Sequence, residues 1–350
     1  MYFASDNSSP AHPSVLAALQ KANEGYVGSY GSDPITAQVK ARIQDLFEAP
    51  DAAVFLVATG SVANALSLSV LCDPWQSVFC HRVSHVEEDE CGAPEFYIGG
   101  GKLVLVEGEH AKMSPSALRE AIEFTGRSGV HNLQRGPVSL TNATEHGTVY
   151  TPAEVAELTA VARAFGLRTH MDGARFANAL VSTGATPAEM TWKAGIDVLS
   201  FGGTKNGLMG VEAVVIFDPK LAWEFELRRK RGGHLFSKHR YLAAQMLAYL
   251  TDDLWLTLAG HANAMAQRLS RGMADLPGGS LVHPTEANAV FAQWPRAAHQ
   301  AAQQAGAQYY LWPFNQSFDG PGDVPLAARL VCSWSTTPED VDQFLALVRG

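Results

Sequence analysis

Short apolar runs alternate along the chain with segments whose apolar residues recur at helical spacing. The runs are typical of buried strands, and the periodic segments are typical of helices that cover a sheet. The predicted strands lie at residues 52–58, 77–86, 102–108, 136–144, 167–174 and 196–203. The segment 12–31 is predicted to form a helix followed by a glycine-rich loop. Further helices are predicted at 36–49, 62–71, 114–124 and 151–166. Thr151 followed by Pro152 is a typical helix start.

The alternation of strands and helices with short connections predicts an α/β fold with a mainly parallel sheet and helices on both faces. From about residue 222 the pattern changes to long helices and then to mixed short elements, such as NAVFAQW at 288–294. We therefore expect an N-terminal arm at 1–13, a large domain at 14–245 and a smaller C-terminal α+β domain at 246–350.

The composition is that of an ordinary globular protein, with 350 residues, 47% hydrophobic and 17% charged. The formal net charge of −9 argues against nucleic acids and anionic membranes as partners, because both attract basic surfaces. No apolar run reaches the roughly 18 residues of a membrane span, and MYFASDNSSPAHPS lacks the segments of a signal peptide. The four cysteines form no CxxC pair, so we expect no disulfide framework, no zinc site and a reducing, cytoplasmic setting.

The stretch VLSFGGTKNGLMGVEAVVIFD, residues 198–218, places Lys205 among glycines between two apolar runs that predict strands. Burial lowers the pKa of a lysine, and the neutral amine can attack an aldehyde to form a Schiff base. The glycines allow a bulky planar cofactor to approach the backbone. A solvated turn lysine has the same local pattern, so Lys205 alone does not decide the function.

Two further features precede Lys205 at the ends of predicted strands. Gly60 and Ser61 lie between a strand and a helix, and the free amides at a helix N-terminus bind phosphate. Asp172 ends the strand LRTHMDGA and offers a carboxylate for a pyridine nitrogen. Each also has a plain structural interpretation, as a strand–helix turn or a helix N-cap. The order of phosphate turn, aspartate and lysine at strand ends, where open α/β sheets bind ligands, favours a pyridoxal phosphate site.

The motifs TGSVAN, HMDGARFANA, SFGGTKNG and ARLVCSW together resemble the threonine aldolase group of the β-eliminating-lyase family, over nearly the whole chain. The resemblance implies the aspartate aminotransferase fold, known as fold type I, with pyridoxal 5'-phosphate as cofactor. It also implies aldol cleavage of L-β-hydroxy-α-amino acids, such as L-threonine, L-allo-threonine and L-phenylserine, to glycine and an aldehyde. Active sites of this fold usually form between subunits, so a homodimer or homotetramer is implied as well.

The resemblance assigns cofactor-binding roles residue by residue. Lys205 matches the Schiff-base lysine, Asp172 the partner of the pyridine nitrogen, and Arg175 a contact of the ring hydroxyl. The turn at 60–61 matches the phosphate-binding turn, with serine where many relatives have threonine. His85, in VSHVEEDE, matches a histidine that stacks on the cofactor ring.

Substrate-binding roles follow in the same way. Ser5, in ASDNS, and Arg329, in ARLVCSW, match positions that bind the substrate carboxylate, to which the arginine fork is suited. A structural salt bridge is the alternative for Arg329. His131, in GVHNL, matches a second histidine near the substrate hydroxyl. The base that takes the hydroxyl proton stays open between His85, His131 and an ordered water.

Two segments are implied to act across a subunit interface. KRGGHLFSKHR matches a segment whose basic residue contacts the neighbouring subunit's phosphate, and we prefer Lys238 to Arg240 for this role. Tyr30 and Asp33, in SYGSDP, match a loop that reaches the neighbouring site. The chain departs from the family pattern at EDECGAP, where relatives have E-A-G-G, and at TKNGLMG, where the common lysine loop is SKGLG.

Other functions remain open at this point. Within the same fold, the chain is compatible with a tryptophanase-like or cysteine lyase, or with an aminotransferase. A non-catalytic oligomeric binding protein is an alternative from another class. The 12 histidines and HVEEDE prompt a metal hydrolase, but the segment contains no HxxxH or HExxH, so we expect no metal site.

Overall fold

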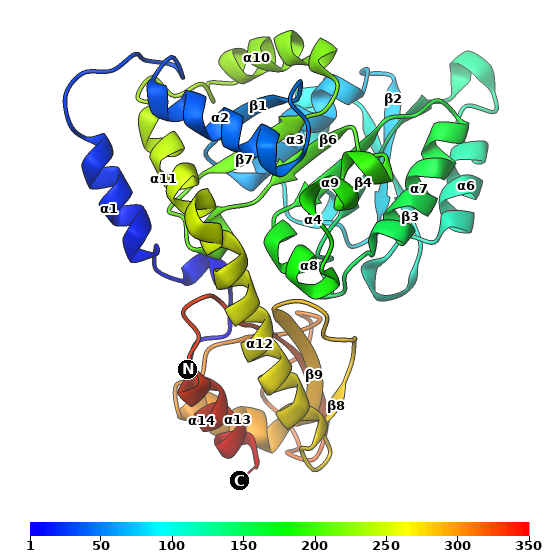
Figure 1. Ribbon diagram of the computed structural model, residues 1–350. Coiled ribbons are helices and arrows are strands. Elements are labelled where there is room, and N and C mark those ends of the chain that lie inside the picture. Colours follow the sequence, from blue (N-terminus) through cyan, green and yellow to red (C-terminus); the bar gives the residue numbers. More distant parts are fainter. Residues whose placement is uncertain (350) are drawn as a thin grey trace.

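The computed structural model describes residues 1–349 and contains two β-sheets (Figure 1). The larger sheet has the strand order β1-β7-β6-β5-β4-β2-β3. Its pairs from β6 to β3 are parallel, whereas β7 is antiparallel to both of its neighbours, which confirms the predicted α/β fold with a mainly parallel sheet. The strands are β1 (Ala53–Val57), β2 (Gln76–His81), β3 (Lys102–Val106), β4 (Gln134–Thr141), β5 (Thr169–Gly173), β6 (Val198–Phe201) and β7 (Glu212–Ile216).

Helices cover both faces of this sheet, because successive strand residues point to opposite sides and both sides are apolar. Leu199 packs on one face with α2, α6, α7, α8 and α11, and Val198 packs on the other with α3 and α10. The helices around this sheet are α1 (Pro13–Ala22), α2 (Pro34–Leu46), α3 (Gly60–Leu71), α4 (His85–Glu88), α5 (Ala93–Ile98), α6 (Pro115–Phe124), α7 (Pro152–Ala164), α8 (Phe176–Thr183), α9 (Pro187–Met190), α10 (Ala222–Arg231) and α11 (Arg240–Leu250).

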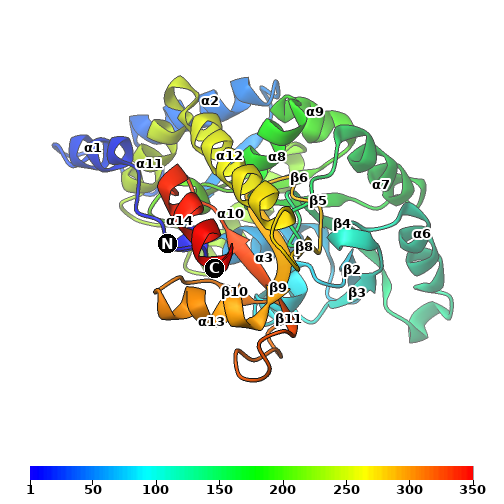
Figure 2. The same cartoon turned by 90° about the horizontal axis from the view of Figure 1, so that it is seen from below.

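The smaller sheet is antiparallel and has the order β10-β11-β9-β8. The long helix α12 runs from the larger sheet to the smaller one, and α13 and α14 pack beside the smaller sheet (Figures 1 and 2). The bounds are α12 (Leu254–Ala274), β8 (Ser280–Leu281), β9 (Ala289–Pro295), α13 (Arg296–Gln304), β10 (Tyr310–Leu311), β11 (Pro325–Val331) and α14 (Pro338–Arg349). The domain limits at 13 and 245 stay a prediction.

The N-terminal residues pack against the smaller sheet rather than along the larger one. Tyr2 forms an isolated β-bridge with Gln308, and Phe3 is buried in the core beneath that sheet. The chain then turns through a short 3₁₀ helix, Asp6–Ser8, capped by Ser5. This course carries Ser5 and the following aspartate to the space between the two sheets.

Local signals in the sequence set several element ends. Thr151 caps α7 through a capping box with Glu154, as a threonine before a proline predicts. The strand predicted at 77–86 is too long, because β2 ends at His81, opposite Val106, the last residue of its partner β3. The chain therefore leaves the sheet there and starts α4 at His85. Among the described residues, no helix has both the length and the apolarity needed to cross a membrane.

Candidate active site

Lys205 lies just past the end of β6, in a 3₁₀ turn that opens the connection to β7. Two side-chain contacts fix this turn. Asn206 Nδ2 donates a hydrogen bond to the Tyr249 hydroxyl at 2.8 Å, and the Gly203 amide donates to the Glu212 carboxylate at 2.5 Å. The lysine is therefore carried by a loop whose backbone is anchored on both sides.

The electrostatic surroundings of Lys205 favour its neutral amine. Burial and the nearby Arg175 guanidinium lower the pKa of Lys205, against the opposing effect of the Asp6 and Asp172 carboxylates. A neutral amine is the nucleophilic form that an aldehyde requires. The structure thus places at the sheet edge a half-buried lysine suited to covalent chemistry, and not a fully solvated turn residue.

Asp172 lies in β5, beside β6, and its side chain is held at both oxygens. Asn64 Nδ2 donates to Oδ2 at 2.9 Å, and the Ala174 amide donates to Oδ1 at 2.9 Å. Burial acts to raise the pKa of Asp172, but the nearby His85 and Lys205 outweigh burial and hold this pKa below its ordinary value. Asp172 is therefore a buried, ionised carboxylate, as the protonated nitrogen of a pyridine ring requires.

His85 and Asp172 belong to one hydrogen-bonded chain. His85 Nδ1 lies 2.9 Å from Glu90 Oε1, and Asn64 Nδ2 donates to the same oxygen at 2.8 Å while it also holds Asp172. The hydrogen bond to Glu90 raises the pKa of His85, although burial opposes the shift. Glu90 is the second glutamate of the divergent EDECGAP segment, and it fixes the orientation of the imidazole.

The turn at Gly60 and Ser61 forms the N-terminus of α3. Thr59 caps this helix by accepting a hydrogen bond from the Val62 amide at 3.4 Å. A Cβ atom added at Gly60 would meet no heavy atom within 4 Å, so the turn faces open space. That space is a cavity of about 320 Å³, also lined by His85, Asp172, Thr204 and Lys205.

A second cavity, of about 190 Å³, adjoins the first at His85 and Lys205 and is also lined by Ser5, Arg175 and Arg329. The Arg329 guanidinium stands 5.2 Å from the centre of the Trp312 ring. Its Nε is buried and has no hydrogen-bond partner among residues 1–349. None of the ion pairs in this part of the chain includes Arg329, so the alternative of a structural salt bridge is not realised.

Comparison with known proteins places this chain in a family. The model of the family described as beta-eliminating lyase matches residues 2–296 of the chain. The chain belongs to the beta-eliminating lyase family. The membership predicted from four short motifs is therefore confirmed over most of its length.

Relatives of this lyase align along nearly their whole chains. Low specificity L-threonine aldolases of Pseudomonas sp. (strain NCIMB 10558) and Pseudomonas aeruginosa are 45% and 44% identical to it, with 99% of this chain and 97% and 96% of theirs covered. A solved threonine aldolase of Leishmania major has a TM-score of 0.91 at 28% identity, covering 99% of this chain and 98% of the other. A solved serine palmitoyltransferase of Sphingomonas wittichii has a TM-score of 0.70 at 16% identity, and the alignment covers 100% of this chain and 86% of the other. This similarity shows only that the two proteins share a fold.

The structure contradicts the placement predicted for His131 in this lyase. His131 ends a 3₁₀ turn just before β4, and it lines a surface groove together with Lys102, the first residue of β3. Lys205 and Asp172 lie at the opposite, carboxyl edge of the sheet. Parallel strands start at one edge and end at the other, so a residue ahead of β4 cannot share a site with residues at strand ends.

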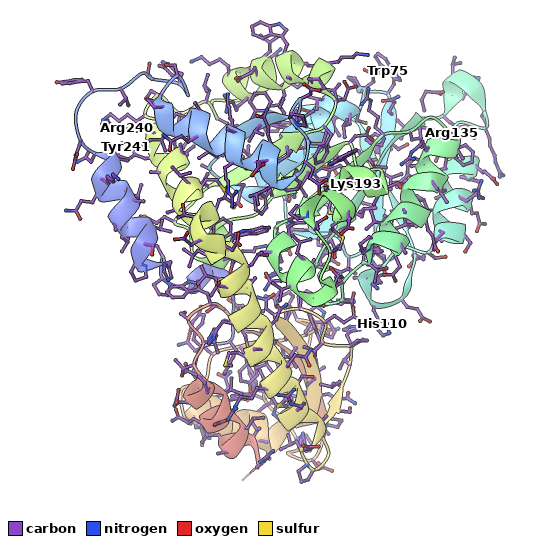
Figure 3. All side chains as sticks on the ribbon, viewed as in Figure 1. Trp75, His110, Arg135, Lys193, Arg240 and Tyr241 are labelled. Atoms are coloured by element: carbon purple, nitrogen blue, oxygen red, sulfur yellow. The ribbon has the colours of Figure 1, made fainter. Side chains whose placement is uncertain are left out.

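The segments predicted to act across a subunit interface lie together at the surface, outside the two cavities of the described chain. The Tyr30 amide donates to the Ser237 carbonyl at 2.9 Å, and Lys238 is exposed. Arg240 instead donates to backbone carbonyls of the loop after α1, beside which it lies in Figure 3. Asp33 is buried and caps α2.

The site contains polar residues that motif analysis missed. Their positions in the predicted elements could have indicated two of them. Glu145 follows β4 at the same edge as Asp172, and Asn64 lies one turn inside α3, facing the sheet. No local pattern shows how Asp6, Asn64 and Glu145 pair, because each binds a partner 60 or more residues away. These residues are Asp6, Asn64, Glu90, Glu145 and Glu212.

Proposed function

We propose that this chain is a carbon–carbon lyase that uses pyridoxal 5'-phosphate to cleave L-β-hydroxy-α-amino acids into glycine and an aldehyde. The observation that carries the proposal is the convergence of Lys205, Asp172 and Arg329, which has no ion-pair partner within residues 1–349, on two adjoining cavities. Relatives named low specificity L-threonine aldolase, similar over almost the full chain, support L-threonine as a substrate. We infer L-allo-threonine and L-phenylserine as further substrates.

The larger cavity fits the cofactor on the chemistry of its donors. The free amides at the start of α3, with the open space at Gly60 and the Ser61 hydroxyl, suit the phosphate. Lys205 supplies the amine for the aldehyde, and Asp172 supplies the carboxylate for the ring nitrogen. His85 provides a flat face for the ring, held by Glu90. When bound, the cofactor accepts the electron pair of the bond that breaks.

The smaller cavity suits the amino-acid substrate. Arg329 offers a guanidinium with an unused donor, and Ser5 lies in the same cavity, so the two together bind the substrate carboxylate. Fixing the carboxylate fixes the rotation about the bond between the substrate nitrogen and Cα. The Cα–Cβ bond is then the one aligned for cleavage, in preference to loss of a proton or of carbon dioxide.

Further features of the proposal concern assembly and location. We infer a homodimer or homotetramer in which Tyr30 and Lys238 complete a neighbouring subunit's site, because both are exposed and lie outside the cavities of their own chain. Lys238 is preferred to Arg240, whose guanidinium already binds carbonyls of its own chain. The four cysteines are unpaired among the described residues, which supports a cytoplasmic location.

The test of the proposed function is a product assay on the purified protein. A visible absorbance band that hydroxylamine removes is expected, with glycine and aldehyde formed from L-threonine and from L-phenylserine. L-Cysteine serves as the comparison substrate. Release of ammonia in place of an aldehyde would indicate an elimination reaction, and transfer of the amino group to a keto acid would indicate an aminotransferase. A colourless protein with no turnover would indicate a binding protein.

A further inference from the structure

Aldol cleavage requires a group that takes the proton from the substrate β-hydroxyl. His131 lies at the opposite edge of the sheet, and His85 Nδ1 is engaged with Glu90. Three carboxyls line the substrate cavity with Lys205 and form no ion pair within residues 1–349: Glu88, Asp89 and Glu145. Glu88 and Asp89 are exposed, whereas Glu145, four residues past the end of β4, is partly buried and has one fully buried carboxyl oxygen.

The Glu145 carboxyl is fixed at one oxygen and free at the other. Oε1 accepts a hydrogen bond from the His85 amide at 2.7 Å and from the Thr141 hydroxyl at 2.9 Å. Oε2 is buried and has no hydrogen-bond partner among residues 1–349. A buried carboxyl oxygen without a partner costs free energy. A substrate hydroxyl in the cavity removes this cost by donating to Oε2.

The charge state of Glu145 suits proton transfer near neutral pH. Burial raises the pKa of Glu145 to about 7, although the hydrogen bond from the His85 amide opposes this shift. A base whose pKa lies near the working pH combines a populated basic form with sufficient proton affinity. The hydrogen bond to Glu90 raises the pKa of His85, which lowers the fraction of its neutral form, and the face of its ring is proposed to lie against the cofactor.

We propose that Glu145 is the general base that accepts the β-hydroxyl proton of the substrate. The hydroxyl proton passes to Oε2, the C–O bond becomes the aldehyde carbonyl, and the Cα–Cβ bond breaks. Its electron pair stays with the Cα fragment, and a proton from solvent then completes glycine. Glu145 returns its proton to solvent, so protons and electrons balance over one turnover. This inference rests on the proposed function, since it assigns a residue to that reaction.

The experiment measures two reactions, cleavage and proton exchange, in the wild-type holoenzyme and in the Glu145→Gln holoenzyme. Cleavage of L-threonine needs the hydroxyl base, whereas exchange of the glycine Cα proton with deuterated water does not. Glutamine keeps an acceptor for the His85 amide and the Thr141 hydroxyl. We expect kcat for cleavage to fall by about 10²- to 10⁴-fold. The rate of exchange and the cofactor absorbance should stay within a few-fold of wild type.

Two further variants make the result decisive. Glu120→Gln, on the exposed face of α6, is the matched control and should leave both reactions unchanged. Glu145→Ala should lose cleavage and regain part of it when formate is added, because a small carboxylate can enter the cavity. Rescue of Glu145→Ala by formate tests the proposal even if Glu145→Gln does not fold.

The outcomes separate the two proposals. Cleavage by Glu145→Gln at near the wild-type rate would overturn the role of Glu145 and leave the proposed function intact. Equal loss of cleavage and exchange, or no rescue of Glu145→Ala by formate, would reduce Glu145 to a structural residue. A wild-type enzyme that binds the cofactor but cleaves no L-β-hydroxy-α-amino acid would overturn the proposed function, and this proposal with it.

Discussion

Asp6 and Arg175 form a two-point ion pair at the edge of the site. Arg175 Nε donates to Asp6 Oδ2 at 2.7 Å, and Nη2 donates to Oδ1 at 2.9 Å. Asn288 Nδ2 also donates to Oδ2, at 3.0 Å. The N-terminal segment thereby links Arg175, two residues after β5 of the larger sheet, to Asn288, the residue before β9 of the smaller one.

Removing the charge of Asp6 should destabilise the fold. In Asp6→Asn, the largely buried Arg175 guanidinium keeps its charge but loses the charged partner, at a cost of about 3 kcal/mol in the free energy of unfolding. Urea denaturation of the cofactor-free protein at pH 7 measures this cost. The control is Asp45→Asn, which removes an exposed partner of Arg42 and should change stability by about 0.5 kcal/mol or less. Equal stability of the two variants would contradict the prediction.

The Asp6–Arg175 pair makes the free energy of unfolding depend on pH in the acidic range. Although burial opposes the shift, Arg175 holds the pKa of Asp6 below its ordinary value. A carboxyl whose pKa is lower in the folded state stabilises fully above its unfolded pKa, about 4, and loses this contribution as the pH falls further. The difference in stability between wild type and Asp6→Asn should therefore shrink from pH 4 downwards. A difference that is constant over this range would show that the Asp6 charge is not responsible.

Replacing Lys205 should remove both the cofactor signal and turnover. Lys205→Ala lacks the amine that binds the cofactor aldehyde, so the visible absorbance band of the holoenzyme and nearly all activity should disappear. Lys193→Ala, which removes an exposed lysine paired with Glu48, should keep both. Borohydride reduction of wild type followed by peptide mass analysis should locate the adduct at residue 205. An unmodified peptide at that position would refute the assignment.

Arg329 should act mainly on substrate binding. Arg329→Ala removes a guanidinium that holds no carboxylate partner within the described chain, so stability should change little while kcat/KM for L-threonine falls about 10- to 100-fold. Arg268→Ala, which breaks an exposed pair with Asp342, is the control and should keep wild-type kinetics. A large loss of stability with unchanged KM would assign Arg329 to the fold and not to the substrate.

The rate of cleavage should rise with pH through about 7. Burial raises the pKa of Glu145 to about 7, and the base acts only when deprotonated, so kcat falls below this pH. Glu145→Gln should lack this acid limb, while Glu120→Gln should retain it. An identical limb in both variants would assign it to another group. Other ionisable groups near this carboxyl are Cys80, His85, Tyr150, Asp172 and Arg175, and Lys205 lines the same cavity.

The local sequence pattern was sufficient to predict those features that depend only on residues close together in the sequence. The apolar run before Asp172 and the run before Lys205 each specify a buried strand, and parallel strands end at one edge. The two side chains therefore had to lie near one another, before any contact was known. The start of α7 was equally predictable, since Thr151 forms its cap with Glu154, three residues on.

Contacts between distant segments could not be predicted from local sequence patterns. His131 was matched through a short motif, GVHNL, but the sheet topology places it at the wrong edge and brings Glu145 to the right one. The pairing of Asp6 with Arg175 depends on how the N-terminal segment packs against the smaller sheet, which no periodicity in either segment encodes. The amino-acid sequence by itself thus determined the strands, their carboxyl edge and the lysine–aspartate pair. Only the tertiary structure decided which buried carboxyls face them, because burial and charge pairing arise between segments that meet on folding.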